Sequence, residues 1–111
     1  MKELRTWSGA NAFRYEGSVS TGITIHCGDG FSRTYRISHD AILDTLGRFS
    51  GKTTPVGCHR TAPPEGSIGD WLRVHHKRGG IMSYLGSILV QEGFARRTPE
   101  GLISIARFRF D

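Results

Sequence analysis

The sequence predicts an α+β fold in which strands come first, helices follow, and short strands return at the end. Residues 23–37 alternate apolar and polar around a glycine-rich turn, as a β-hairpin does. Later segments carry apolar residues at helical spacing. The 111 residues suit a single domain with one hydrophobic core. We expect N-terminal strands over residues 1–37, and helices with a C-terminal hairpin over residues 38–110.

The N-terminal strands are predicted from alternation. Phe13 and Tyr15 fall on one side of a short strand, and Ile23, Ile25 and Cys27 fall on one side of another. Gly28-Asp29-Gly30 then provides a turn in which glycine accepts a positive φ.

The strand after this turn, residues 31–37, places Phe31, Tyr35 and Ile37 on one side. Arg33 interrupts this apolar side, which indicates a position at the edge of the sheet. Aromatic and arginine residues mixed on a strand are also able to stack bases of single-stranded nucleic acid. The simpler interpretation, which we adopt at this point, is that Phe31 and Tyr35 belong to the core.

Ser38 begins the first predicted helix as its N-cap, and Asp40 suits the positive end of the helix dipole. Its apolar stripe consists of Ile42, Leu43, Leu46 and Phe49. Gly47 or the Ser50-Gly51 pair ends it. Residues 52–66 read as a loop with a short strand near residues 53–57 and a stiff pair of prolines at its end.

Ser67 caps the second predicted helix, and Asp70 stands where a capping box places its acidic partner. The stretch from His75 to Gly80 cannot easily continue it, because two adjacent glycines cost about 1 kcal/mol each in a helix interior. The third helix carries its apolar stripe at Ile81, Leu85, Ile88 and Leu89. Gly93 ends it, and a hairpin follows with its turn near Pro99-Glu100-Gly101.

Residues 66–110, which read helix, turn, helix and hairpin, resemble the winged helix-turn-helix superfamily. Leu89, Gly93, Phe94 and Ala95 occupy the places of the turn that leads from a recognition helix into the first wing strand. The resemblance implies a winged-helix-like three-helix core with a C-terminal β-hairpin wing, to which an N-terminal β-hairpin is added. It also implies that the third helix contacts DNA.

The charge of the chain favours an anionic partner. Fifteen Lys and Arg against ten Asp and Glu give a net charge of +5, and basic domains attract polyanions. Between Trp71 and Pro99 the sequence contains five Lys and Arg residues but a single acidic residue, Glu92. The sequence therefore predicts a nucleic-acid-binding protein, with double-stranded DNA as its first ligand and a role in regulation, defence or mobile elements. The expected binding residues are Arg73, His76, Lys77, Arg78, Ser83, Ser87, Arg96 and Arg97.

The third helix would turn Met82, Ser83, Gly86 and Ser87 toward the ligand, with Tyr84 and Gln91 as further candidates. This face lacks the Arg, Asn and Gln side chains that read base edges. The flanking cations suit phosphate contacts better.

A second hypothesis is a protein-interaction module or a homodimer, because related folds serve different functions. Its partner surface would include Trp7, Phe13 and Tyr15.

No catalytic motif stands out, so we do not expect an enzyme, although a nuclease using Asp29, Asp40 or Asp44 is left open. The inverted pairs His26-Cys27 and Cys58-His59 lack the ligand spacing of zinc sites. We therefore expect no metal and no other cofactor. The chain shows no apolar run of membrane-spanning length and no signal peptide, and its two cysteines suit the reducing cytoplasm.

Overall fold

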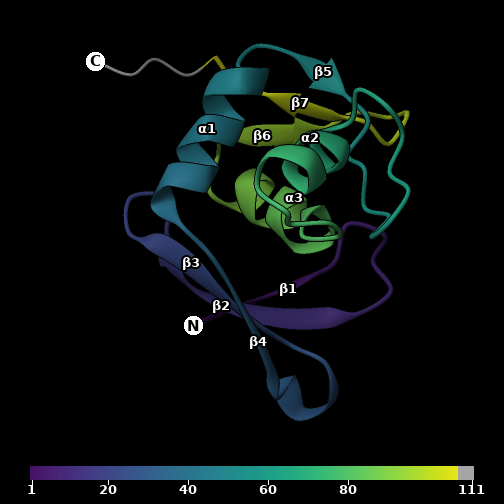
Figure 1. Ribbon diagram of the computed structural model, residues 1–111. Coiled ribbons are helices and arrows are strands. Elements are labelled where there is room, and N and C mark those ends of the chain that lie inside the picture. Colours follow the sequence, from purple (N-terminus) through teal and green to yellow (C-terminus); the bar gives the residue numbers. More distant parts are fainter. Residues whose placement is uncertain (108–111) are drawn as a thin grey trace.

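The computed structural model describes residues 1–107, in which three α-helices lie with two antiparallel sheets (Figure 1). The strands are β1 (Lys2–Arg5), β2 (Ala12–Ser18), β3 (Gly22–Cys27), β4 (Arg33–Ile37), β5 (Thr53–Thr54), β6 (Ala95–Arg97) and β7 (Ile103–Ile105). The helices are α1 (His39–Phe49), α2 (Ile68–His75) and α3 (Met82–Gln91), and a short 3₁₀ turn, η1, spans Asp29–Phe31. In Figure 1 the larger sheet lies below α2 and α3, and the smaller sheet lies above them.

The larger sheet is a meander in the order β1-β2-β3-β4. Its inner face follows the predicted alternation, because Phe13, Tyr15, Ile23 and Ile25 are all at most 2% exposed. Polar residues of the same strands point outward, where Glu16 and His26 lie 3.2 Å apart across β2 and β3.

The predicted helix caps are confirmed. Ser38 Oγ accepts a hydrogen bond from the Ala41 N–H, and Ser67 Oγ accepts one from the Asp70 N–H. The Asp70 carboxylate does not complete a capping box; it accepts a hydrogen bond from Arg73 instead. Gly93 ends the α3 segment with a φ of 87°, a left-handed conformation that suits glycine.

The smaller sheet has the order β5-β7-β6. β5 confirms the short strand expected in the long loop, and β6 and β7 form the expected hairpin. Ile103 and Ile105 of β7 are buried and join the core. Positions 108–110 of the predicted C-terminal part lie outside the described residues.

The predicted organisation of the fold is wrong at the N-terminus. Instead of one hairpin added to a three-helix core, a complete four-stranded sheet precedes the first helix, and β4 leads directly into α1. Its inner face supplies much of the single buried cluster that the helices share. The helices therefore do not form a separate winged-helix core. The reason is that α1 packs on β3 and α3 packs on β1, so their apolar faces are partly covered by this sheet.

The strand β1 was not predicted, because its own residues give little indication of a strand. Lys2–Arg5 has no alternating pattern of its own, and three of its four residues are exposed. It becomes a strand by pairing with β2, where Leu4 lies opposite Phe13.

Within residues 1–107, none of the helices has the length and apolar character needed to cross a bilayer.

Candidate nucleic-acid interface

A cleft of about 370 Å³ opens between β4 and the turn that joins α2 to α3. Its walls come from the larger sheet, from the loop before α2, and from the turn with the start of α3. We call it the basic cleft and define it by its charged and aromatic side chains, which are Arg33, Tyr35, Arg60, Lys77, Arg78 and Tyr84.

The edge strand β4 places Arg33 and Tyr35 in the basic cleft. Arg33 lies opposite Cys27 in the sheet, and Tyr35 lies opposite Ile25, so both point to the inner side. Beyond the apolar core this side opens to solvent, and Tyr35 is 38% exposed. The expectation that Tyr35 belongs to the core is therefore wrong. Phe31 is not in the core either; it is only half-buried, and the Arg14 guanidinium lies over its ring.

The end of α2 places Lys77 and Arg78. Lys77 has a φ of 55°, a left-handed conformation that follows the end of α2 and comes two residues before Gly79. The Arg78 N–H then donates back to the Leu72 carbonyl at 3.1 Å. This reversal directs the two basic residues to the cleft rather than along the helix axis.

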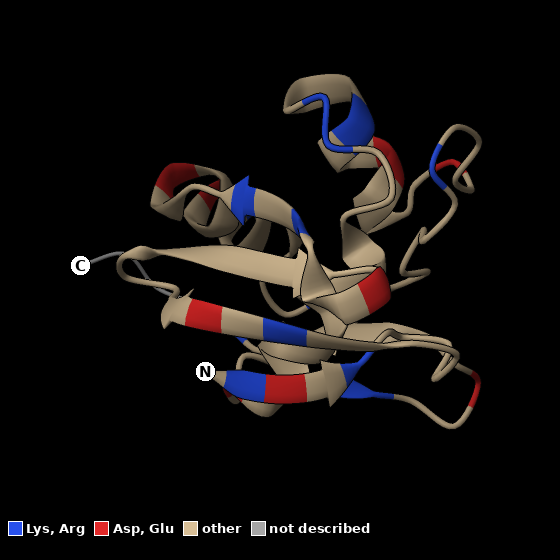
Figure 2. Ribbon diagram, turned by 90° about the horizontal axis from the view of Figure 1, so that it is seen from below, with Lys and Arg blue, Asp and Glu red and all other residues tan. Residues whose placement is uncertain are grey.

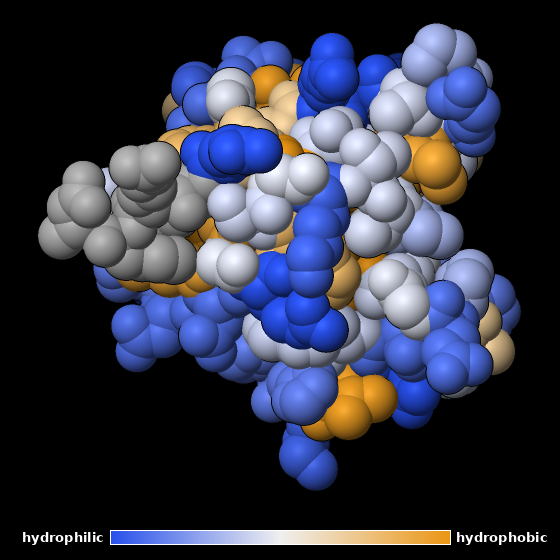
Figure 3. Space-filling model, turned by 90° about the horizontal axis from the view of Figure 1, so that it is seen from above, coloured by the Kyte–Doolittle hydropathy of each residue, from blue (hydrophilic) through white to orange (hydrophobic). Residues whose placement is uncertain are grey.

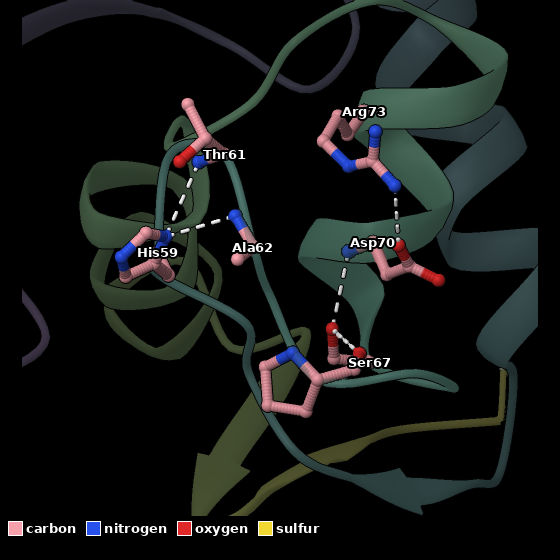
Figure 4. A network of polar contacts seen from close by, with 7 residues as sticks. His59, Thr61, Ala62, Ser67, Asp70 and Arg73 are labelled. Carbon is pink, nitrogen blue, oxygen red and sulfur yellow. Dashed lines mark hydrogen bonds and ion pairs between the residues drawn. The ribbon is translucent and has the colours of Figure 1, made fainter.

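The loop before α2 places Arg60. His59 Nδ1 accepts hydrogen bonds from the N–H groups of Thr61 and Ala62, at 3.2 and 2.9 Å, and so holds a tight turn around Arg60 (Figure 4). This turn packs on Gly79, where an added Cβ would lie 2.2 Å from the Arg60 carbonyl oxygen. Only glycine leaves room for this close approach.

The four cations of the basic cleft have no acidic partner. Arg33, Arg60, Lys77 and Arg78 form no ion pair with a carboxylate of the described chain. Some cations elsewhere on the surface are paired with carboxylates: Lys2 contacts Glu92 at 2.8 Å, and Arg14 contacts Glu3 at 3.0 Å. Figure 2 shows basic and acidic residues close together on the strand that begins at the N-terminus. Other cations, among them Arg36, Lys52 and Arg96, also lack an ion pair within the described residues, so the basic cleft is distinguished by the convergence of four cations and not by unpaired charge alone.

Two further groups of the cleft are kept uncharged. Burial, together with a hydrogen bond to Cys27, raises the pKa of Tyr84 to about 12. Burial also raises the pKa of the Cys58 thiol, although a hydrogen bond with Ser83 and the charge of Arg97 act in the opposite direction. Near neutral pH the cleft therefore carries positive charge from its arginines and lysine, without a thiolate or phenolate to offset it.

The predicted binding residues are divided among several surfaces. Lys77, Arg78 and Ser83 line the basic cleft. Arg97 and Ser87 line a separate hollow beside Trp7, and Arg96 lines a third hollow on the smaller sheet. Neighbouring strand residues point to opposite faces, which explains why Arg96 and Arg97 separate.

Arg73 and His76 face other partners. Arg73 reaches Asp70 along α2, with Nη2 and Oδ1 3.1 Å apart (Figure 4). His76 lies 3.2 Å from Asp44 of α1, and its ring stacks at a tilt against Trp71. These contacts turn the two side chains toward the helices rather than toward the basic cleft.

The expected outward face of α3 is covered. Met82 is fully buried, and the Trp7 N–H donates to the Ser83 carbonyl at 2.8 Å. The Trp7 ring covers Gly86 so closely that a Cβ there would lie 2.9 Å from it. The expectation that Met82 and Gly86 face a ligand is wrong, because the segment between β1 and β2 occupies that side of the helix.

The aromatic partner surface expected at the N-terminus is not formed either. Phe13 and Tyr15 are buried in the core, and the Arg97 guanidinium covers the half-buried Trp7 ring at 3.9 Å. Phe13 and Tyr15 therefore do not contribute to a surface for a partner. Figure 3 shows the molecule from above in Figure 1, and the surface seen there is mostly hydrophilic, with small, separate hydrophobic areas.

Three members of the basic cleft were missing from the predicted site: Arg33, Tyr35 and Arg60. Tyr84 was a further candidate on the outward face of the third helix but was not among the expected binding residues. For Arg33 a signal was present, since it interrupts the apolar side of its strand. Tyr35 shared that side, and an edge position for one implied an edge position for the other. Arg60 gave no signal, because its place depends on packing against Gly79.

The described residues contain no group of three or more His, Cys, Asp or Glu side chains arranged to hold a metal ion. His59 turns into its own loop, and His26 faces Glu16 on the outer side of the sheet.

Comparison with protein-family models, with curated proteins and with solved structures finds no match. The resemblance to winged helix-turn-helix proteins therefore stays a prediction that no comparison tests.

Proposed function

We propose that the protein binds nucleic acid and holds phosphate groups of the backbone in the basic cleft. The observation that carries this proposal is the convergence of Arg33, Arg60 and the Lys77-Arg78 pair from three separate segments, with no carboxylate to neutralise them. Like charges gathered in this way repel one another, which favours a bound anion.

The cleft suits a chain of phosphates better than a single small anion. Its cations come from three separate segments that line an open hollow of about 370 Å³. Lys and Arg side chains spaced in this way position a nucleic-acid backbone. Trp7 covers the α3 face that would enter a groove of duplex DNA, so α3 supplies no contacts to base edges.

The test compares two double variants that change the net charge equally. Arg60→Gln/Lys77→Gln removes two charges from the basic cleft, whereas Lys52→Gln/Arg96→Gln removes two charges that lie outside it. Fluorescence anisotropy with labelled duplex DNA and labelled single strands measures the affinity. We expect the first pair to weaken binding about ten-fold or more, since charged hydrogen bonds contribute about 1.5–3 kcal/mol each. The second pair should change it little.

Equal losses from the two pairs would show that net charge alone attracts the ligand. Absence of binding to every nucleic acid at low salt would refute the proposed function outright, because phosphate contacts are strongest there.

A further inference from the structure

The basic cleft contains aromatic side chains as well as cations, and this combination narrows its ligand. Tyr35 is 38% exposed on the edge strand β4. Its ring centroid lies 6.3 Å from that of Tyr84, with an angle of 32° between the rings. Tyr84 is itself fixed by an edge-to-face contact with Phe13, at 5.2 Å and 82°. The pair therefore offers one exposed ring supported by a second, rigidly held ring.

We infer that the basic cleft binds an unpaired nucleotide, whose base stacks on Tyr35 while its phosphates contact the surrounding cations. This inference rests on the proposed function and specifies its ligand as single-stranded nucleic acid. Every base has a flat π-face, so stacking on an exposed tyrosine requires no particular sequence.

The distance between the two rings decides how the base lies. A base between two rings needs about 7 Å, or two layers of about 3.5 Å each. The separation of 6.3 Å is too small for such a sandwich. The base therefore stacks on the solvent side of Tyr35, and Tyr84 supports the ring from behind.

The opposite wall supplies cations for the phosphates. Arg60 packs on Gly79 and Gly80, and Lys77 and Arg78 directly precede these glycines. A nucleotide stacked on Tyr35 therefore has Arg60, Lys77 and Arg78 in the same cleft. A duplex does not fit this arrangement, because its bases are stacked on one another and present only their edges in the grooves.

The experiment separates stacking from phosphate contact by using two strands. One is a single strand of about ten nucleotides; the other has the same number of phosphates but abasic sites in place of bases. Each is titrated by fluorescence anisotropy against the wild type, Tyr35→Leu and Tyr35→Phe. Thermal unfolding verifies that each variant is folded.

We expect the wild type to bind the base-bearing strand at least about five-fold more tightly than the abasic strand. Tyr35→Leu should remove this difference between the two strands, whereas Tyr35→Phe should retain it, because the ring remains. The base-bearing strand should also bind more tightly than a duplex of the same length.

Different failures point to different errors. If both strands bind equally, and if binding still depends on Arg60 and Lys77, then the proposed function holds and the stacking site is refuted. A duplex that binds as tightly as the single strand also refutes the inference. If no strand binds, the proposed function fails and the inference fails with it. The comparison of the base-bearing strand with the abasic strand needs only the wild-type protein. It therefore tests the inference even if a variant does not fold.

Discussion

Lys77 is a lysine in a backbone conformation that glycine usually occupies at the end of a helix. Its φ of 55° lies in the left-handed region, where the Cβ of an L-residue is crowded. Gly79 and Gly80 follow two residues later, so glycine is present nearby but not at the strained position. Residues in strained backbone conformations are concentrated at functional sites, where the function of the side chain offsets the loss of stability. We therefore argue that the lysine side chain is needed in the basic cleft.

We therefore expect Lys77→Gly to change stability and affinity in opposite directions. Relief of the left-handed strain should stabilise the protein by up to about 1 kcal/mol, while loss of the cation should weaken nucleic-acid binding. Chemical denaturation and anisotropy measure the two effects. Lys77→Asn serves as the matched variant, because asparagine tolerates this conformation but carries no charge. A stability that falls in both variants would contradict the account.

At the scale of elements, the basic cleft exists because the loop before α2 packs against the turn after it. Gly79 has an ordinary φ, and yet an added Cβ would lie 2.2 Å from the Arg60 carbonyl oxygen. Two chain segments almost twenty residues apart therefore meet at a residue without a side chain. The contact fixes Arg60 beside Lys77 and Arg78.

We predict that Gly79→Ala displaces this loop. The methyl group has no space, so the substitution should destabilise the protein by about 1–3 kcal/mol and weaken binding by moving Arg60. In an Arg60→Gln background the additional loss of affinity should be small, because the displaced charge is already absent.

Gly93→Ala is the control for backbone strain. Gly93 has a φ of 87° and no neighbouring atoms within 4 Å of an added Cβ. This variant should lose stability but retain its affinity while folded. If both glycine variants impair binding equally, displacement of Arg60 is not the cause.

At the scale of the whole molecule, Glu92 joins the larger sheet to the helices. Its carboxylate, just after α3, accepts hydrogen bonds from Lys2 Nζ on β1 and from the Tyr15 hydroxyl on β2, each at 2.8 Å. These two donors hold the pKa of Glu92 below its usual value of 4.5. Burial and the same carboxylate raise the pKa of Tyr15, so its hydroxyl stays a donor.

The depressed pKa of Glu92 predicts a pH-dependent stability. The contribution is fully present above 4.5, the usual pKa of the group, and is lost as the pH falls through the lower folded value. Glu92→Gln should therefore be less stable than the wild type by about 1 kcal/mol at neutral pH. The two proteins should converge under strongly acidic conditions.

Thermal unfolding across this pH range measures the difference. Glu3→Gln is the control, because the Glu3–Arg14 pair is about half-exposed on both sides and such pairs contribute little. A constant difference between wild type and Glu92→Gln at every pH would show that shape, not charge, explains the effect.

The sequence by itself determined the features that depend on neighbouring residues. The caps at Ser38 and Ser67, the helix end at Gly93, and the alternation of β2 and β3 were all predicted, because hydrogen bonds and steric limits within a few residues decide them. The sequence also placed Lys77 and Arg78 in a basic turn between two helices, and both residues line the basic cleft.

Only the tertiary structure decided which surfaces remain open. It showed that Trp7 covers α3, that Tyr35 lies beyond the core on an edge strand, and that Arg60 packs beside the α2–α3 turn. The physical reason is that burial and charge pairing at these sites depend on segments far apart in the chain. A local pattern shows which side of a strand or helix is apolar, but the packing of distant segments determines which side is covered.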